Sequence, residues 1–185
     1  MNEPGYEIRS IGGSLRVDSP GKLAGYAVLY NSLSQDLGGF VEQVKPGALK
    51  RSLAQPDNIR AYVEHDPQKL LARVGSRTLE LREHPKGIYF ELMLPDVSYA
   101  RDLGVLVQRG DIAGVSFGFR VNPGGDAWEM RSGQLTRDLT DIDLKEISIV
   151  GDPAYADTTV AVRALQAWRG SHESIDPRVL WMATL

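Results

Sequence analysis

Short β-prone segments separated by turn residues recur along most of this chain, and helical patterns interrupt them at only a few places. Alternating or β-branched runs predict strands at residues 23–31, 58–66, 70–74, 78–84, 88–94, 112–121 and 142–150, and a hairpin at 127–140. Apolar residues at helical spacing predict helices at 45–53, 99–110 and 158–170. Because strands and helices do not alternate regularly, a doubly wound parallel sheet is disfavoured. We expect a mainly β fold with some α (α+β), as an antiparallel barrel or sandwich with helices outside.

Composition and charge exclude several classes of function. The 185 residues are 42% hydrophobic and 24% charged, as in an ordinary globular domain. The net charge of −3 has no basic stripe, so nucleic acid is not expected as a partner. No run of 18 apolar residues predicts a membrane span, and the N-terminus lacks the features of a secretory signal. The absence of cysteine excludes disulfides and thiol nucleophiles, and fits a reducing compartment.

The segment 110–121, GDIAGVSFGFRV, places one hydroxyl in an otherwise apolar, glycine-spaced strand. Ser116 is there either because a small residue fits a close approach, or because the glycines clear room for a substrate to reach its oxygen. The G-x-S-x-G pattern also matches the nucleophile elbow of α/β-hydrolases. That elbow needs a sharp turn into a helix after the serine, whereas this strand continues through FGFRV. We therefore reject the elbow.

Three histidines are the only imidazoles available as a base for such a serine. His65 comes at the end of a predicted strand, beside a turn, where a scaffold can hold a reactive group at an accessible edge. The alternative interpretation is a surface histidine paired with Glu64 or Asp66. His84 falls in a hairpin turn and His172 in the polar tail. No H-x-H or H-x-x-x-H spacing and no glycine-rich phosphate loop occurs, so no metal and no cofactor are predicted.

A histidine base also needs a group that orients its ring, and four carboxylates are candidates: Asp66, Asp141, Asp143 and Glu146. Strict alternation in 142–150 would place Ile142, Leu144, Glu146, Ser148 and Val150 on one face and Asp143, Lys145, Ile147 and Ile149 on the other. Neither face is then cleanly apolar. An inward Glu146 would need a partner such as His65, because burying an unpaired carboxylate is costly. The alternative is a surface carboxylate balanced by Lys145.

Four stretches together resemble the prohead (head-maturation) serine proteases of tailed bacteriophages. They are GYAVLYNSLSQDLGGFVEQVKPGALKRSL (25–53), VEHDPQKLLARV (63–74), RGDIAGVSFGFRV (109–121) and LKEISIVGDPAYADT (144–158), in consistent order and spacing. The family is related in fold to the herpesvirus assemblins. The resemblance implies a closed or nearly closed antiparallel β-barrel surrounded by helices.

The resemblance also implies roles for three residues. The family's histidine falls on His65, its serine on Ser116, and its third member maps best to Glu146, with Asp143 as the alternative. The herpesvirus relatives use a second histidine in the third place and an arginine-rich turn for the oxyanion. This chain has neither there, so backbone amides of residues 151–154, or Arg120, are the oxyanion candidates.

The biology implied by the resemblance is specific. Residues 1–170 would be one protease domain, and 171–185 a flexible or self-cleaved tail. The protease would act inside the prohead, in the host cytoplasm, with the scaffolding segment of the major capsid protein and itself as substrates. A homodimer is expected, because the herpesvirus relatives work as dimers. The rival expectation is a non-enzymatic capsid or scaffold assembly protein of the same fold.

Overall fold

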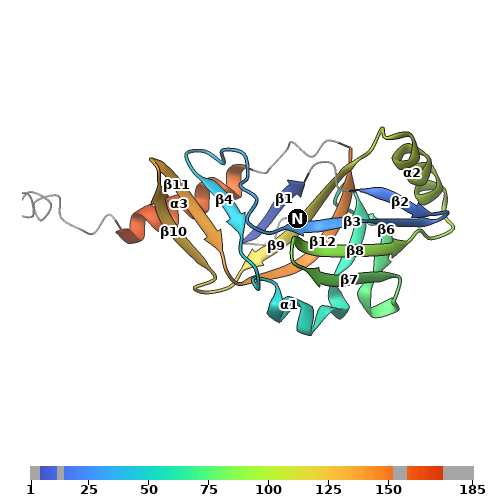
Figure 1. Cartoon of the computed structure of the whole chain (residues 1–185), viewed down its shortest axis with the longest axis horizontal. Helices are drawn as coiled ribbons and strands as arrows, with labels where there is room; N and C mark the ends of the chain where they lie inside the picture. Colours follow the sequence, from blue (N-terminus) through green and yellow to red (C-terminus); the bar gives the residue numbers. More distant parts are fainter. Residues whose placement is uncertain (1–4, 12–14, 152–157, 173–185) are drawn as a thin grey trace, which may run out of the picture.

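The computed structural model describes residues 5–11, 15–151 and 158–172, and its strands form three hydrogen-bonded sheets (Figure 1). The five-stranded sheet has the order β1 (Tyr6–Ile11), β9 (Gly114–Val121), β12 (Ile142–Val150), β5 (Arg60–Val63), β6 (Asp66–Arg73). The four-stranded sheet has the order β2 (Arg16–Ser19), β3 (Lys22–Leu29), β8 (Gly87–Met93), β7 (Leu79–His84). The three-stranded sheet has the order β10 (Asp126–Arg131), β11 (Gln134–Leu139), β4 (Val41–Val44).

The helices lie at the ends and edges of these sheets. They are α1 (Lys50–Ala54), α2 (Ser98–Arg109) and α3 (Thr158–His172), with single 3-10 turns at Pro56–Asn58 and Val74–Ser76. Figure 1 shows α2 beside β2 at one end and α3 beside the three-stranded sheet at the other. None of the helices in the described ranges combines the length and apolar character needed to cross a membrane.

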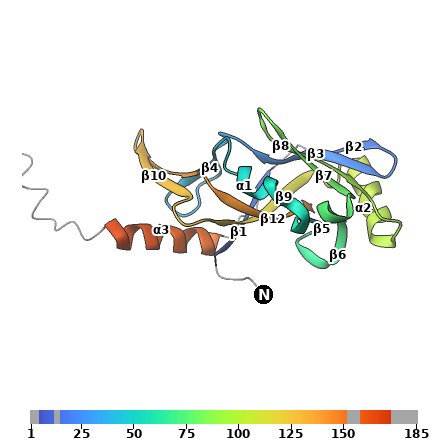
Figure 2. The same ribbon diagram turned by 90° about the horizontal axis from the view of Figure 1, so that it is seen from below.

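The four- and five-stranded sheets pack face to face around the main core (Figure 2). Leu23 and Phe90 enter it from the first sheet, and Phe119 and Ile147 from the second, and all four are fully buried. Burial of such a side chain contributes about 1.5–3 kcal/mol. A smaller cluster lies under α3, where Trp128 stacks on Trp168. The face of β9 that carries its phenylalanines is thereby committed to the core, and the opposite face is left for a site.

The mainly β, α+β prediction is confirmed, but the barrel is not found. Most ladders are antiparallel, while β12 with β5 and β11 with β4 are parallel. The hydrogen-bonded ladders of the described residues stop at the sheet edges, so they close no barrel.

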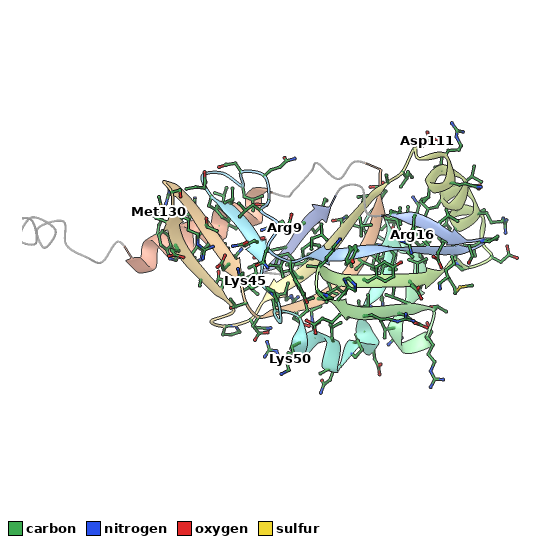
Figure 3. The ribbon with its side chains drawn as sticks, in the orientation of Figure 1. Arg9, Arg16, Lys45, Lys50, Asp111 and Met130 are labelled. Carbon is green, nitrogen blue, oxygen red and sulfur yellow. The ribbon has the colours of Figure 1, made fainter. Side chains whose placement is uncertain are left out.

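A buried ion network joins the five-stranded and three-stranded sheets. Arg9 of β1 donates to Glu7 at 2.6 Å and to Glu42 of β4 at 2.9 Å. Arg137 of β11 donates to the same two carboxylates, at 3.0 and 2.9 Å. Figure 3 labels Arg9 between β1 and β4. Ion pairs, rather than apolar contacts, therefore connect the two sheets at this junction.

A β-bulge in β12 overturns the strict alternation expected for 142–150. Leu144 is opposite Phe119, yet Glu146 is opposite Gly118, so Lys145 is an extra residue in the ladder. Leu144 and Ile147 consequently share the core-facing side, although simple alternation separates them. Glu146 turns to the other face. The mixed pattern in the sequence is a regular apolar face shifted by one residue.

Several element boundaries also differ from the sequence expectation. β1 was not predicted, and β6 begins at residue 66 rather than 70, directly after the turn that holds His65. The helix expected at 45–53 is confined to Lys50–Ala54. The helix expected at 99–110 is confirmed as α2, and Gly110 ends it with a φ of 81° and its N–H donated to Leu106 O.

Candidate active site

Ser116 lies in the middle of β9, between β1 and β12. The ladders place Ser10 of β1 and Ser148 of β12 directly across from it, so these side chains share one face of the sheet. The neighbouring Phe117 belongs to the core cluster on the other face. The strand continues unbroken to Val121, which is incompatible with a nucleophile elbow. Ser116 has 0% exposure, so protein groups alone surround its Oγ.

His65 reaches this face from the tight turn between β5 and β6. Val63 pairs with Asp66, so Glu64 and His65 are the two central residues of the turn. Both have left-handed backbone angles, with φ of 50° and 56°. Such two-residue turns normally use Asn and Gly, because larger side chains are strained there. The side chain of Glu64 accepts the Gly151 N–H at 2.6 Å, which fastens the turn to the end of β12.

One line of hydrogen bonds joins Ser116, His65 and Glu146. His65 Nε2 lies 2.8 Å from Ser116 Oγ, and His65 Nδ1 lies 2.5 Å from Glu146 Oε1. Because a carboxylate only accepts, the ring proton belongs on Nδ1, which leaves Nε2 of the neutral ring to accept from the Ser116 hydroxyl. An imidazole held in this way can take a serine proton, while the carboxylate stabilises the imidazolium that forms.

Ser116 Oγ has a second hydrogen-bonding neighbour, the backbone carbonyl oxygen of Arg9, at 3.0 Å. A hydroxyl has one proton, so Ser116 can donate either to His65 or to Arg9 at a given moment. When Nε2 carries a proton, the ring donates to Oγ and the hydroxyl donates to Arg9. Both protonation states of His65 are thus accommodated without leaving Ser116 unpaired.

Comparison with known proteins shows the family to which the chain belongs. A family model described as caudovirus prohead serine protease matches residues 7–171, a range that includes all three residues. The chain belongs to this family. This prohead protease family member is 32% identical to the prohead protease of Enterobacteria phage HK97 over 143 residues. The match covers 76% of this chain and 59% of the phage protein, so the chain spans less than two thirds of that relative's length.

A solved structure supports the fold of this family member. The bacteriophage T4 capsid assembly protease, gp21, is similar with a TM-score of 0.53 over 80% of this chain and 99% of the other. The sequence identity is 12%. At this sequence identity, the similarity shows that the two chains share an arrangement of helices and strands.

The alternative carboxylates in this prohead protease family member lie in other interactions. Asp143 pairs with Lys145 and lies near the Ser52 hydroxyl, at 3.5 Å. Asp141 pairs with Arg51, and Asp66 accepts the backbone N–H of Gln68 at 2.9 Å and pairs with Lys69. Glu146 is the carboxylate whose hydrogen bond to His65 the structure records.

His84 lies apart from this group of residues, and it is the other histidine whose side chain the structure describes. His84 is exposed in the four-stranded sheet, where Nδ1 is 3.0 Å from the hydroxyl of Tyr26. The side chain of His172 lies outside the described residues. Within the ranges that the structure describes, no group of three or more His, Asp or Glu side chains is arranged to hold a metal ion.

The candidates for stabilising the oxyanion are the backbone amides of residues 151–154 and the side chain of Arg120. The amide of Gly151 is already donated to Glu64, so it does not face an incoming carbonyl in this arrangement. Residues 152–154 lie outside the described residues. Arg120 is on the same face of β9 as Ser116 but lies four residues along the strand, opposite Asp143.

Gly118 has a role that the sequence did not reveal. A Cβ atom at this position would lie 1.8 Å from the hydroxyl oxygen of Tyr6 and 2.9 Å from Cγ of Glu146. The glycine therefore makes room for two protein side chains, rather than for a substrate. A glycine within a strand often marks such a close approach, and that signal was present, but Tyr6 lies in a strand that was not predicted.

Proposed function

We propose that this chain is a serine endopeptidase of phage head maturation. Ser116 is the nucleophile, His65 the general base and Glu146 the group that orients His65. The observation that carries the proposal is the pair of contacts at 2.8 and 2.5 Å that links the three side chains. Ser116 and Glu146 lie 51 and 81 positions from His65 in sequence, so local chain geometry does not bring them to it. Membership of the prohead serine protease family supports the same reading.

The proposed reaction is acyl transfer. His65 Nε2 takes the Ser116 proton as Oγ bonds to the carbon of the scissile peptide, giving a tetrahedral oxyanion. The C–N bond then breaks, the leaving amine takes the proton from His65, and Ser116 is left acylated. Water, deprotonated by the same imidazole, attacks the ester carbon, the ester C–O bond breaks to release the acid, and the imidazolium returns its proton to Ser116 Oγ. Because Ser116 has no exposed surface, substrate binding has to be accompanied by a movement that opens a path to Oγ.

The substrates in this proposal are the scaffolding segment of the major capsid protein and the protease itself. The names of the HK97 and T4 relatives, a prohead protease and a capsid assembly protease, favour an assembling capsid as the place of action. Self-cleavage would fall in residues 171–185, near the end of α3. The proposed location is the prohead interior in the host cytoplasm. A homodimer completes the proposal, and sedimentation that finds an active monomer would contradict that part.

A non-enzymatic capsid or scaffold assembly protein is the second candidate. The complete burial of Ser116 favours it, because a nucleophile has to be reached by substrate. The two candidates differ sharply in one respect: the assembly protein does not need the Ser116 hydroxyl.

Co-expression with the capsid protein, followed by mass spectrometry of the products, separates the candidates. Ser116→Ala and His65→Ala should each lower cleavage by about 10³-fold or more, because the first variant lacks the nucleophile and the second lacks the base. His84→Ala is the matched control, since His84 is exposed on another sheet, and it should cleave like the parent. Normal capsid processing by Ser116→Ala would establish the non-enzymatic candidate instead. Circular dichroism of each variant checks that the fold is retained.

A further inference from the structure

The hydroxyl of Tyr6 lies directly above Gly118, beside the carboxylate of Glu146. Tyr6 is the first residue of β1, and its side chain is on the same face as Ser116, opposite Arg120 in the ladder. The missing Cβ of Gly118 is what admits it, since that atom would lie 1.8 Å from the phenol oxygen. The same Cβ would lie 2.4 Å from the ring carbon that bears the hydroxyl. The end of the tyrosine, rather than its ring face, therefore meets Glu146.

Tyr6 acts here as a hydrogen-bond donor. Burial raises the pKa of its hydroxyl well above the usual value, and the charge of Glu146 and the hydrogen bond to it raise the pKa further. The phenol thus keeps its proton wherever an imidazole titrates. A carboxylate only accepts, so the bond runs from Tyr6 to Glu146.

Glu146 needs such a partner more than a shorter acid would. A glutamate side chain has three rotatable bonds, and its carboxylate samples many positions unless more than one contact holds it. The Ser148 hydroxyl also donates to Glu146 Oε1, but at 3.3 Å it is a long and weak bond. The contact with His65 does not replace this restraint, because it is the contact that Glu146 has to be positioned to make.

We infer that Tyr6 is a positioning residue of the site: its hydroxyl holds the Glu146 carboxylate where it meets His65 Nδ1. The inference rests on the proposed function, since it assigns a second support to the proposed base. It also gives β1 a double role. One end of this strand supplies the Tyr6 hydroxyl to Glu146, and three residues on, the Arg9 carbonyl accepts from Ser116. One edge strand thereby contacts both ends of the hydrogen-bonded line.

The test is a double-mutant cycle between Tyr6→Phe and Glu146→Gln. The readout is the rate at which a fluorophosphonate probe labels Ser116, because the probe needs an activated serine but no particular peptide sequence. Tyr6→Phe should slow labelling by on the order of tenfold in the parent, as expected for a lost hydrogen bond to a charged group. In the Glu146→Gln background the same change should slow it less than twofold, because the carboxylate that Tyr6 supports is gone.

If labelling in the Glu146→Gln background is too slow to measure, an NMR measurement gives a second readout. The proton between His65 and Glu146 in a bond of 2.5 Å should give a far-downfield NMR signal. Tyr6→Phe should shift or broaden this signal. Tyr89→Phe is the matched control, because Tyr89 hydrogen-bonds Arg16 in the four-stranded sheet, and it should change neither readout.

The outcomes distinguish this inference from the function on which it rests. Equal slowing by Tyr6→Phe in both backgrounds would make Tyr6 merely structural and overturn the inference. Labelling and NMR signal that match the parent would also overturn it, while loss of labelling in Ser116→Ala would leave the proposed function standing. If the parent is labelled no faster than Ser116→Ala, the proposed function fails and the inference fails with it.

Discussion

Two residues at the site have backbone angles that are unfavourable for their side chains. Glu64 and His65 adopt left-handed backbone angles at a cost of about 1–3 kcal/mol each, where Asn-Gly would be unstrained. The strain has a geometric result: the tight turn directs the imidazole back over β12 to Glu146 and Ser116. Glu64 offsets part of the cost, because its N–H donates to Ile149 O at 3.0 Å and its carboxylate accepts from Gly151. Backbone strain that persists in this way is typical of functional sites.

Comparing two carboxylates of β12 tests the residue-scale interpretation. Glu146→Gln should lower the rate of peptide cleavage by about 10²–10⁴-fold, because the neutral amide cannot stabilise the imidazolium. Asp143→Asn is the matched control and should stay within about twofold of the parent, because Asp143 pairs with Lys145 and not with His65. The kcat/KM of each variant on a peptide spanning a mapped cut site is the measurement. An Asp143→Asn loss as large as that of Glu146→Gln would assign the orienting role to Asp143.

At the scale of elements, a single irregularity in β12 decides which side chains reach the site. The bulge at Lys145 lets Leu144 and Ile147 face the core together and leaves Glu146 beside Gly118. Without this bulge, alternation would bury a carboxylate or expose an isoleucine.

Polar groups connect the strands of the three-stranded sheet. Arg131 of β10 makes a bidentate pair with Asp138 of β11, at 3.0 and 2.7 Å. Gln43 of β4 donates to the same carboxylate at 2.8 Å.

The Asp138 contacts predict a pH-dependent contribution to stability. The hydrogen bond from Arg131, with a further one from Gln43, lowers the pKa of Asp138. In acid the unfolded chain therefore binds this proton more readily, so the contribution is complete above the usual aspartate pKa of about 4 and is lost as pH falls through the lowered value. Asp138→Asn should lower the free energy of unfolding by about 1 kcal/mol at neutral pH, and by progressively less as the pH falls below about 4.

Urea denaturation at a series of pH values measures this difference. Glu129→Gln is the control, because Glu129 contacts the same arginine from an exposed position, and its effect should stay within about 0.5 kcal/mol. A deficit in Asp138→Asn that is constant with pH would show that lost packing, and not the charge, is responsible.

At the scale of the whole molecule, the buried ion network connects the five-stranded sheet to the three-stranded sheet. Glu7, Arg9, Glu42 and Arg137 have side chains no more than 7% exposed, and they connect β1 to β4 and β11. Burial raises the pKa of Glu42 even though Arg9 and Arg137 oppose the rise. Because the Arg9 carbonyl also accepts from Ser116, the junction between sheets and the candidate site share one strand. The three-stranded sheet is therefore connected, through β1, to the strand whose Arg9 carbonyl contacts Ser116.

Removing one cation from this network should destabilise the whole fold. Arg137→Met leaves two buried carboxylates facing one arginine, and we expect a loss of about 3–5 kcal/mol in the free energy of unfolding at neutral pH. The folded variant should take up a proton on Glu42 more readily than the unfolded chain, so the loss should grow as pH rises and shrink as pH falls. Urea denaturation at pH 5 and pH 8 tests both points. Arg16→Met, at a site 62% exposed, should change stability by less than about 0.5 kcal/mol, and equal effects of the two variants would contradict the role of the network.

Local pattern alone was enough to determine the α+β class, most strand positions, the α2 helix with its Gly110 end, and His65, Ser116 and Glu146 as residues to consider. These follow from hydrophobic periodicity and turn chemistry, which depend on neighbours in sequence. The roles of the three residues stay a proposal. The tertiary structure alone decided four features. They are the separation into three sheets, β1 with its Tyr6, the bulge at Lys145, and the turn at His65 with its left-handed backbone angles. Each depends on contacts between segments far apart in the chain, and no local pattern records which distant residue will fill the space above a glycine.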